Sequence, residues 1–244
     1  MIYQHILSAK KKGKKLLAIL LDPEKVKLDM LSASLSKISN SEVDFIFVGG
    51  STVKKGVTQE LVTRLKQQTT IPIVLFPGHY SQITSDANAI LFLSLISGRN
   101  PEYLINQQVK AVPLIRESGL EVIPTGYILI DGGKKTSVQK VSETLPLLSK
   151  AIQEITDTAC AGMYMGKKII YLEAGSGALK PVQASVISAV RENVDIPLIV
   201  GGGIRSEQEL QRAYESGADM VVIGTAFEED NEVLYKIKKN EHIH

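Results

Sequence analysis

Eight short apolar runs, separated by segments with helical spacing, constrain this 244-residue chain more than any other feature. Most runs are continuous rather than alternating, as in parallel strands whose two faces are both buried. The runs are 16–21, 45–48, 71–76, 89–95, 121–130, 169–172, 197–200 and 220–223. Strands that alternate with helices in this way predict an α/β protein, a (β/α)₈ TIM barrel formed as a single domain over residues 1–244. An open doubly wound sheet is the alternative.

The connection between the third and fourth runs is an exception to the alternation. Residues 77–88 contain Pro77-Gly78-His79 and are too short and too broken for a full crossover helix. We expect a loop or an extra extended segment there. After the seventh run, by contrast, Ser206 and Glu209 form a capping-box pattern, and Gly217 is typical of a residue just past a helix end.

Composition excludes several classes of protein. The 28 basic and 26 acidic residues are nearly balanced, which gives no support for a nucleic-acid surface. The single cysteine, Cys160, rules out a disulfide framework or a thiolate metal cluster within one chain. Two of the four histidines, His242 and His244, lie at the far C-terminus, so no zinc site is predicted.

The sequence contains no signal-peptide pattern and no apolar stretch of membrane-spanning length, so we expect a cytoplasmic protein. Peripheral contact with a membrane surface is compatible with this expectation. Lysines cluster at 10–12 and 14–15. We interpret them as the solvated end of a first helix, with contact to anionic lipid or RNA as the alternative.

Glycine and polar residues follow almost every predicted strand. Because the active site of such a barrel lies at the C-terminal ends of the strands, these segments are the candidate site. Gly201-Gly202-Gly203 and Gly224-Thr225, after the last two strands, have the spacing of a phosphate site. Glycines let backbone N–H groups approach a phosphate, and Gly175-Ser176-Gly177 can close a third side. Ordinary tight turns are the alternative interpretation.

A carboxylate, Glu173, ends the sixth run. At that position it can accept a proton from a substrate hydroxyl, whereas a salt bridge to a neighbouring strand is the structural alternative. Tyr171 lies two residues earlier and therefore faces the same side of the strand. It either hydrogen-bonds the substrate or packs in the core.

Asp22 and Ser51 follow the first two predicted strands, which are neighbours in a barrel. A carboxylate and a hydroxyl are hard oxygen ligands, and together they suit Mg²⁺ that also binds phosphates. Taken alone, Asp22-Pro23 is also typical of a helix N-cap. His79 is interpreted as a surface or pocket-lining residue rather than a ligand.

Several motifs together resemble the geranylgeranylglyceryl phosphate synthase family of prenyltransferases, whose bacterial relatives include heptaprenylglyceryl phosphate synthases. The motifs are LLDPEK (20–25), FVGGS (47–51), LFPG (75–78), YLEAGSGA (171–178), VGGGIR (200–205) and VIGTAFE (222–228). The GGG-I and G-T motifs are common to phosphate-binding barrels. The combination of YLEAGSGA with LLDPEK and FVGGS is specific.

The resemblance implies a barrel that lacks one helix near the third strand, a cytoplasmic homo-oligomer (dimer or hexamer), and Mg²⁺ held by Asp22 and Ser51. It assigns sn-glycerol 1-phosphate to Tyr171, Leu172, Glu173, Ala174, Gly175, Ser176, Gly177, Gly202, Gly203, Gly224 and Thr225. The second substrate would be a polyprenyl diphosphate, most simply geranylgeranyl diphosphate. Tyr80, Ile96, Tyr103 and Ile128 are candidates for the groove that holds its tail.

The reaction that the resemblance implies is Mg²⁺-dependent prenyl transfer to the glycerol 3-hydroxyl, with Glu173 as the catalytic base and Tyr171 beside it. One alternative is another phosphate-binding barrel enzyme, such as a sugar-phosphate isomerase or an aldolase. An aldolase needs a strand-borne Schiff-base lysine, and none of the eight runs contains one. The other alternative is a non-catalytic barrel that senses a phosphate ligand.

Overall fold

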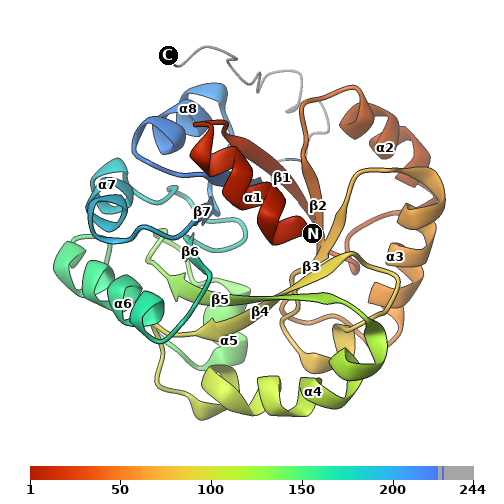
Figure 1. Cartoon of the computed structure of the whole chain (residues 1–244), viewed down its shortest axis with the longest axis horizontal. Helices are drawn as coiled ribbons and strands as arrows, with labels where there is room; N and C mark the ends of the chain where they lie inside the picture. The colour runs from red at the N-terminus through yellow and green to blue at the C-terminus, as the bar shows by residue number, and fades with distance from the viewer. Residues whose placement is uncertain (225–226, 228–244) are drawn as a thin grey trace.

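A closed barrel of eight parallel strands forms the centre of the molecule (Figure 1). The computed structural model describes residues 1–224 and residue 227. The strands are β1 (Leu16–Leu21), β2 (Phe45–Val48), β3 (Ile73–Leu75), β4 (Ala89–Leu95), β5 (Glu121–Leu129), β6 (Ile169–Glu173), β7 (Leu198–Gly201) and β8 (Met220–Ile223). β8 pairs in parallel with β1 and closes the ring. The predicted (β/α)₈ barrel is therefore confirmed.

Helices surround the strands. They are α1 (Ile2–Lys11), α2 (Leu31–Ser39), α3 (Val57–Gln68), α4 (Gln107–Ser118), α5 (Ser137–Ser142), α6 (Ile152–Tyr164), α7 (Ala184–Asn193) and α8 (Glu207–Glu215). Short turns add η1 (Leu28–Met30), η2 (Tyr80–Gln82) and the π-helical η3 (Glu102–Asn106). Only η2 lies between β3 and β4, so the predicted loss of one crossover helix is confirmed. The capping box at Ser206 and Glu209 is also present.

Buried side chains form two layers, because successive residues of a strand point to opposite faces. The inner layer fills the barrel and includes Phe45, Phe47 and Tyr171. The outer layer lies between the strands and the helices and includes Ile170 and Leu172. Tyr171 therefore points into the barrel, while its two neighbours on β6 pack against the surrounding helices.

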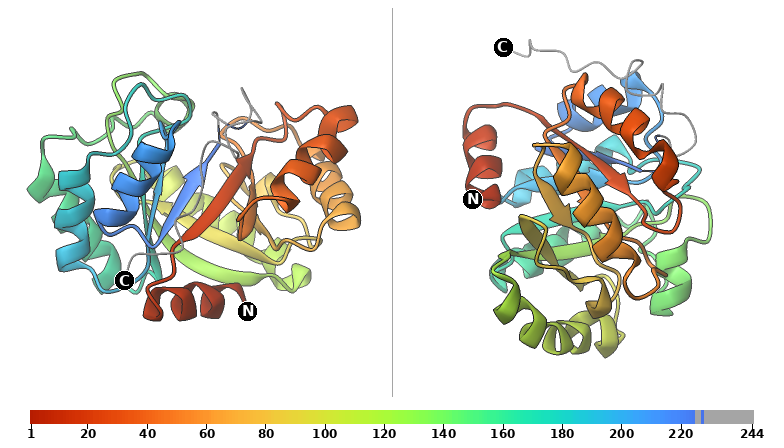
Figure 2. Two further views of the ribbon diagram at one scale, coloured as in Figure 1. Left: turned by 90° about the horizontal axis from the view of Figure 1, so that it is seen from above. Right: turned by 90° about the vertical axis from the view of Figure 1, so that its right-hand side faces the viewer.

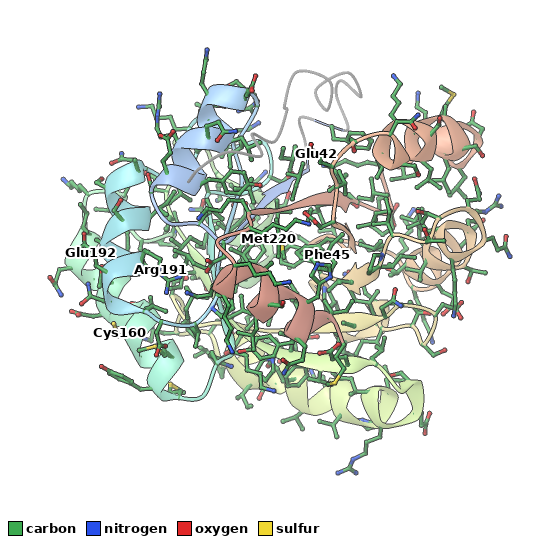
Figure 3. All side chains as sticks on the ribbon, turned by 45° about the horizontal axis from the view of Figure 1, so that its top comes forward. Glu42, Phe45, Cys160, Arg191, Glu192 and Met220 are labelled. Carbon is green, nitrogen blue, oxygen red and sulfur yellow. The ribbon has the colours of Figure 1, made fainter. Side chains whose placement is uncertain are left out.

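Helix α1 covers the N-terminal end of the barrel, at the lower edge of Figure 2 (left). Its Ile6 and Ala9 are buried and join the inner layer. Phe45 and Met220, at the starts of β2 and β8, lie next to this helix (Figure 3). The backbone N–H groups of Ile2 and Tyr3 donate to the Glu121 carboxylate at the start of β5. The first turn of α1 is thereby joined to the barrel.

Two further carboxylates at this end also accept backbone hydrogen bonds. Asp44 accepts from Leu17 N at 2.9 Å and faces Lys14 Nζ at 3.4 Å. Asp219 accepts from Leu198 N at 2.8 Å and from Arg191 Nη1 at 3.0 Å. The lysine-rich end of α1 thus belongs to the N-terminal end of the barrel.

Candidate active site

A cavity of about 300 Å³ opens at the C-terminal end of the barrel. Residues at the ends of all eight strands contribute to its wall, from Asp22 after β1 to Gly224 after β8. Its lining is mixed. One side is built from glycines and charged groups, and another side, next to β4 and α4, is apolar with Leu91, Leu93 and Ala111.

Glu173 ends β6 at the cavity wall and is only 5% exposed. Its Oε1 accepts a hydrogen bond from Gly175 N at 2.7 Å. Burial raises the pKa of this carboxyl to about 7, although the hydrogen bond from Gly175 N and the nearby Tyr171 hydroxyl act in the opposite direction. A carboxyl with a pKa near 7 is suited to accept and release a proton at neutral pH.

Two glycines at the end of β7 leave room for the Glu173 carboxylate. Gly201 pairs with Glu173 in the sheet, and a Cβ placed there would lie 2.8 Å from Glu173 Oε2. A Cβ at Gly202, whose φ is +82°, would overlap Glu173 Oε1 and lie 2.6 Å from Gly175 N. Any larger residue at these two positions would displace the carboxylate.

Tyr171 forms the floor of the cavity beside Glu173. Its ring stacks on Phe76 at 5.2 Å between centroids and lies 5.4 Å from the Tyr127 ring. The hydroxyl is buried and has no hydrogen bond of good geometry to any described residue, although it lies close enough to Glu173 to lower the pKa of that carboxyl. Burial and the Glu173 charge raise the pKa of Tyr171 well above 10, so the hydroxyl keeps its proton.

Asp22 and Ser51 lie on the opposite wall of the cavity from β6, on neighbouring strands. Asp22 Oδ1 accepts from Glu24 N at 3.1 Å, and Lys25 Nζ is 3.7 Å from Oδ2. A Cβ at Gly50 would lie 2.8 Å from Asp22 Oδ1, so only glycine allows the second loop this close. Asp22 thus stabilises its own turn and also faces the cavity, but no helix begins there, since the next element, η1, starts at Leu28.

A resident metal site made only of protein ligands is not formed. Within residues 1–224 and 227, no three His, Cys, Asp or Glu side chains gather to hold a metal ion. Asp22 and Ser51 supply two hard oxygens at a partly exposed wall. This fits an ion such as Mg²⁺ that takes its other ligands from a phosphate-bearing substrate and water.

The glycine loops predicted as a phosphate cradle meet on the β6–β8 side. Ser176, Gly177, Gly202, Gly203 and Gly224 all line the cavity. A Cβ at Gly203, where φ is +75°, would lie 2.8 Å from the backbone of Lys180. The glycine at 203 therefore permits close contact between two loops, and a larger residue would clash there rather than fill the cavity.

Three of the residues predicted to contact the substrate present no side chain to the cavity, and a fourth lies outside the described residues. The side chains of Leu172 and Ala174 belong to the outer apolar layer, because they alternate with Tyr171 and Glu173. Gly175 does not line the cavity, and its N–H is engaged with Glu173. Thr225 lies outside the described residues.

The predicted groove residues divide in the same way. Tyr80 and Tyr103 line the cavity. Ile96 and Ile128 pack in the outer layer, so placing them in the groove was wrong. The substrate-loop and groove assignments share one cause. Each residue was assigned from its place near a strand end, without counting which face of the strand its side chain occupies.

Sequence reasoning missed two groups in the wall. Tyr127 and Phe76 complete the aromatic floor, and counting alternate residues along β5 would have pointed to Tyr127. Arg205 also lines the cavity, and its Nη1 donates to Ala178 O at 2.8 Å, which joins the β6 and β7 loops. Its position directly after the glycine run was the available signal.

Comparison with known proteins gives consistent relatives over nearly the whole chain. Residues 10–241 match the PcrB family. A geranylgeranylglyceryl phosphate synthase of Flavobacterium johnsoniae is 54% identical over 230 residues, covering 94% of this chain and 95% of that protein. The protein of the same name from Thermococcus gammatolerans is 37% identical, covering 98% of this chain and 95% of its own length.

A solved structure agrees with the fold as well. The (S)-3-O-geranylgeranylglyceryl phosphate synthase of Thermoplasma acidophilum, crystallised with its substrate sn-glycerol-1-phosphate, matches with a TM-score of 0.91 and 30% identity. The match covers 97% of this chain and 95% of the other. The resemblance carried by the sequence motifs is thereby confirmed, and the chain belongs to the PcrB family.

Proposed function

We propose that this protein is a geranylgeranylglyceryl phosphate synthase, which joins a polyprenyl diphosphate to the 3-hydroxyl of sn-glycerol 1-phosphate. The observation that carries the proposal is the buried Glu173, with a pKa near 7, next to glycine loops suited to a phosphate. The relatives and the matching crystal structure, which holds its substrate sn-glycerol-1-phosphate, support the same reaction.

The acceptor is held at the β6–β8 side of the cavity. Backbone N–H groups of the loops around Ser176, Gly202 and Gly224 approach its phosphate, and Arg205 adds a positive charge to this wall. The glycerol chain then extends toward Glu173 and the neighbouring Tyr171 hydroxyl. Fixing the acceptor in this way converts a bimolecular encounter into an oriented one.

Glu173 accepts the proton of the glycerol 3-hydroxyl as the new C–O bond forms at C1 of the prenyl chain. The bond between C1 and the diphosphate oxygen breaks, and the diphosphate leaves with the electron pair. The Tyr171 hydroxyl, which stays protonated, donates a hydrogen bond at the same place and orients the acceptor. The ether product carries the phosphate of the acceptor.

The leaving diphosphate is held at the wall formed by the β1 and β2 loops. Asp22 and Ser51 would hold Mg²⁺ there, and the ion, when bound, stabilises the negative charge of the departing diphosphate. The apolar side of the cavity, with Leu91, Leu93 and Tyr103, takes the adjoining part of the prenyl chain. The homo-oligomer implied by the family resemblance stays a prediction.

One assay tests the proposal directly. Purified protein is offered a ladder of polyprenyl diphosphates with each enantiomer of glycerol phosphate, with and without Mg²⁺, and the lipid product is identified by mass. We expect one ether product that requires sn-glycerol 1-phosphate and Mg²⁺. Absence of any prenylated glycerol phosphate would refute the proposal and leave the sugar-phosphate enzyme and the phosphate sensor as candidates.

A further inference from the structure

The loops after β5 and β6 carry exposed leucines at the C-terminal end of the barrel. Leu145 is 77% exposed, Leu148 is 53% exposed and Leu179 is 66% exposed. Burial of a leucine contributes substantially to stability, so three solvent-facing leucines on adjacent loops have no role in holding this fold together. They indicate a surface that meets something apolar.

Hydrogen bonds hold these loops together as one surface. Leu147 N donates to Leu129 O at 2.9 Å, which joins segment 145–148 to the end of β5. Leu179 N donates to Gly132 O at 3.0 Å, and a Cβ at Gly133 would lie 3.7 Å from Leu179 Cβ. Backbone hydrogen bonds therefore connect the loops that carry the three leucines to the end of β5.

Lysines surround the leucines. Segments 131–150 and 176–181 contain five lysines and two carboxylates, and all five lysines are exposed. None of these lysines forms an ion pair with any residue in the described part of the chain. We call this surface the leucine–lysine patch, and it consists of Leu145, Leu148, Leu179, Lys134, Lys135 and Lys180.

The leucine–lysine patch is continuous with the mouth of the cavity. A Cβ at Gly177, which lines the cavity, would lie 3.8 Å from Lys134 Nζ. On the other side of the patch, Ser137 and Val138 of α5 line the cavity directly after Lys135. The loops of the patch lie at the upper edge of Figure 2 (left), opposite α1.

We propose that the leucine–lysine patch seats the open end of the barrel on an anionic lipid bilayer. Exposed leucines enter the boundary between headgroups and acyl chains, while the surrounding lysines face the lipid phosphates. Charge complementarity favours this occupant over a second copy of the chain, because two such patches would bring lysines of the same sign together. Within the described residues, no helix is long and apolar enough to span a bilayer.

The inference rests on the proposed function in one respect, since a prenyl diphosphate and its ether product are both lipids that reside in a bilayer. A patch at the cavity mouth places that bilayer where the donor enters and the product leaves. The lysines at 10–12, which first suggested lipid contact, lie at the other end of the barrel and take no part in this seating.

The test is cosedimentation of the full chain with vesicles, in the absence of substrate. We expect binding to vesicles that contain phosphatidylglycerol, little binding to pure phosphatidylcholine, and loss of binding at high salt because salt screens the lysines. Lys135→Gln with Lys180→Gln should lower the partition coefficient about 25-fold, at roughly fivefold for each lysine near the surface. Leu148→Gln with Leu179→Gln should lower it about tenfold or more.

Matched controls come from other parts of the surface. Lys11→Gln with Lys12→Gln changes the same charge at the opposite end, and Met165→Gln changes a side chain that is 76% exposed near the end of α6. Both should bind vesicles like the wild type. The proposal is overturned if the patch variants bind as the wild type does, if the controls lose binding equally, or if the leucine variant alters only the oligomeric state in sedimentation. Because no substrate is present, absence of prenyl transfer leaves this result unaffected.

Discussion

The two ends of the barrel differ in how well their polar groups are satisfied by hydrogen bonds. At the N-terminal end, Glu121, Asp44 and Asp219 each accept backbone hydrogen bonds, and α1 covers the inner layer. At the C-terminal end, burial raises the pKa of Glu173, and the Tyr171 hydroxyl has no well-placed partner among the described residues. A buried carboxyl with a raised pKa and a buried hydroxyl without a well-placed partner both cost stability, so this pair marks the end of the barrel that is built for chemistry.

The largest effect should follow from Glu173→Gln at the C-terminal end. Glutamine retains the size and the hydrogen bond from Gly175 but cannot accept the proton. General bases contribute roughly 10²–10⁴-fold, so kcat should fall by at least about a hundredfold while glycerol phosphate still binds. Single-turnover kinetics measure this, with Glu192→Gln on the exposed face of α7 as the control (Figure 3). A fully active glutamine variant would remove Glu173 from the role of base.

The same carboxyl should also affect stability in a pH-dependent way. The pKa of Glu173 is raised from 4.5 to about 7 on folding, so its contribution to stability is present below pH 4.5 and is lost as the pH rises through 7. At pH 8, Glu173→Gln should raise the free energy of unfolding by roughly 2–3 kcal/mol, with no gain near pH 4.5. Denaturant titrations at the two pH values measure this. Equal stability of both proteins at pH 8 would contradict the raised pKa.

A smaller effect is expected from Asp22→Asn on the opposite wall. The change preserves the shape and the bond from Glu24 N but removes a charge from the proposed Mg²⁺ site. Activity at limiting Mg²⁺ should fall roughly 30-fold, as is typical when support for a metal is weakened, and should partly recover at high Mg²⁺. The exposed Asp29→Asn is the control. A wild-type Mg²⁺ titration for the Asp22 variant would limit that residue to stabilising its turn.

Tyr171→Phe should separate chemistry from stability within the aromatic floor. Phenylalanine preserves the stacking on Phe76 and removes a buried hydroxyl that lacks a well-placed partner, so Tm should be unchanged or slightly higher. Loss of one hydrogen bond to the acceptor should lower kcat/KM about tenfold. Tyr164→Phe, at a residue that is 82% exposed, is the matched control. If Tm falls and kcat/KM is unchanged, the hydroxyl serves the fold alone.

The smallest effect should come from Glu121→Gln at the N-terminal end. Glutamine can still accept a bond from the first turn of α1 but loses the charge near the helix N-terminus, which costs about 1 kcal/mol. Tm should fall by a few degrees, and kcat and KM should stay at wild-type values. Calorimetry with steady-state kinetics checks both. A large change in kcat here would break the division between the two ends.

The barrel itself was predictable because its strands are continuous apolar runs with strong boundaries. The runs at 16–21, 45–48, 89–95 and 220–223 agree with β1, β2, β4 and β8 to the residue. The absent helix before β4 could also be predicted, since 77–88 has neither the length nor the helical spacing. The role of α1 in covering one end could not, because an amphipathic pattern shows that a face is buried without showing against what.

The candidate site was predictable in position but not in orientation. Asp22, Ser51, Tyr171 and Glu173 do meet around one cavity, because strand ends converge in a barrel. The motif alone did not show that the side chains of Leu172 and Ala174 face the outer layer, because alternate residues of a strand face different layers. The leucine–lysine patch depends on segments that meet only through tertiary hydrogen bonds, so no local sequence pattern predicts it.

The glycines at the end of β7 have a consequence for how sequences in this family are compared. Gly201 and Gly202 leave space for the carboxylate of another strand, and a Cβ at Gly201 would also lie 2.5 Å from Tyr171 Oη, so position 201 depends on two side chains of β6. In a saturation mutagenesis screen, these positions should tolerate almost nothing in the wild-type background. Gly201→Ala should become better tolerated once Tyr171 and Glu173 are both shortened to alanine, whereas Gly202→Ala should not, because its φ is +82° and its Cβ would lie 2.6 Å from Gly175 N. Invariance at 201 across an alignment would then record an inherited dependence between two strands, and not only the shape of a ligand.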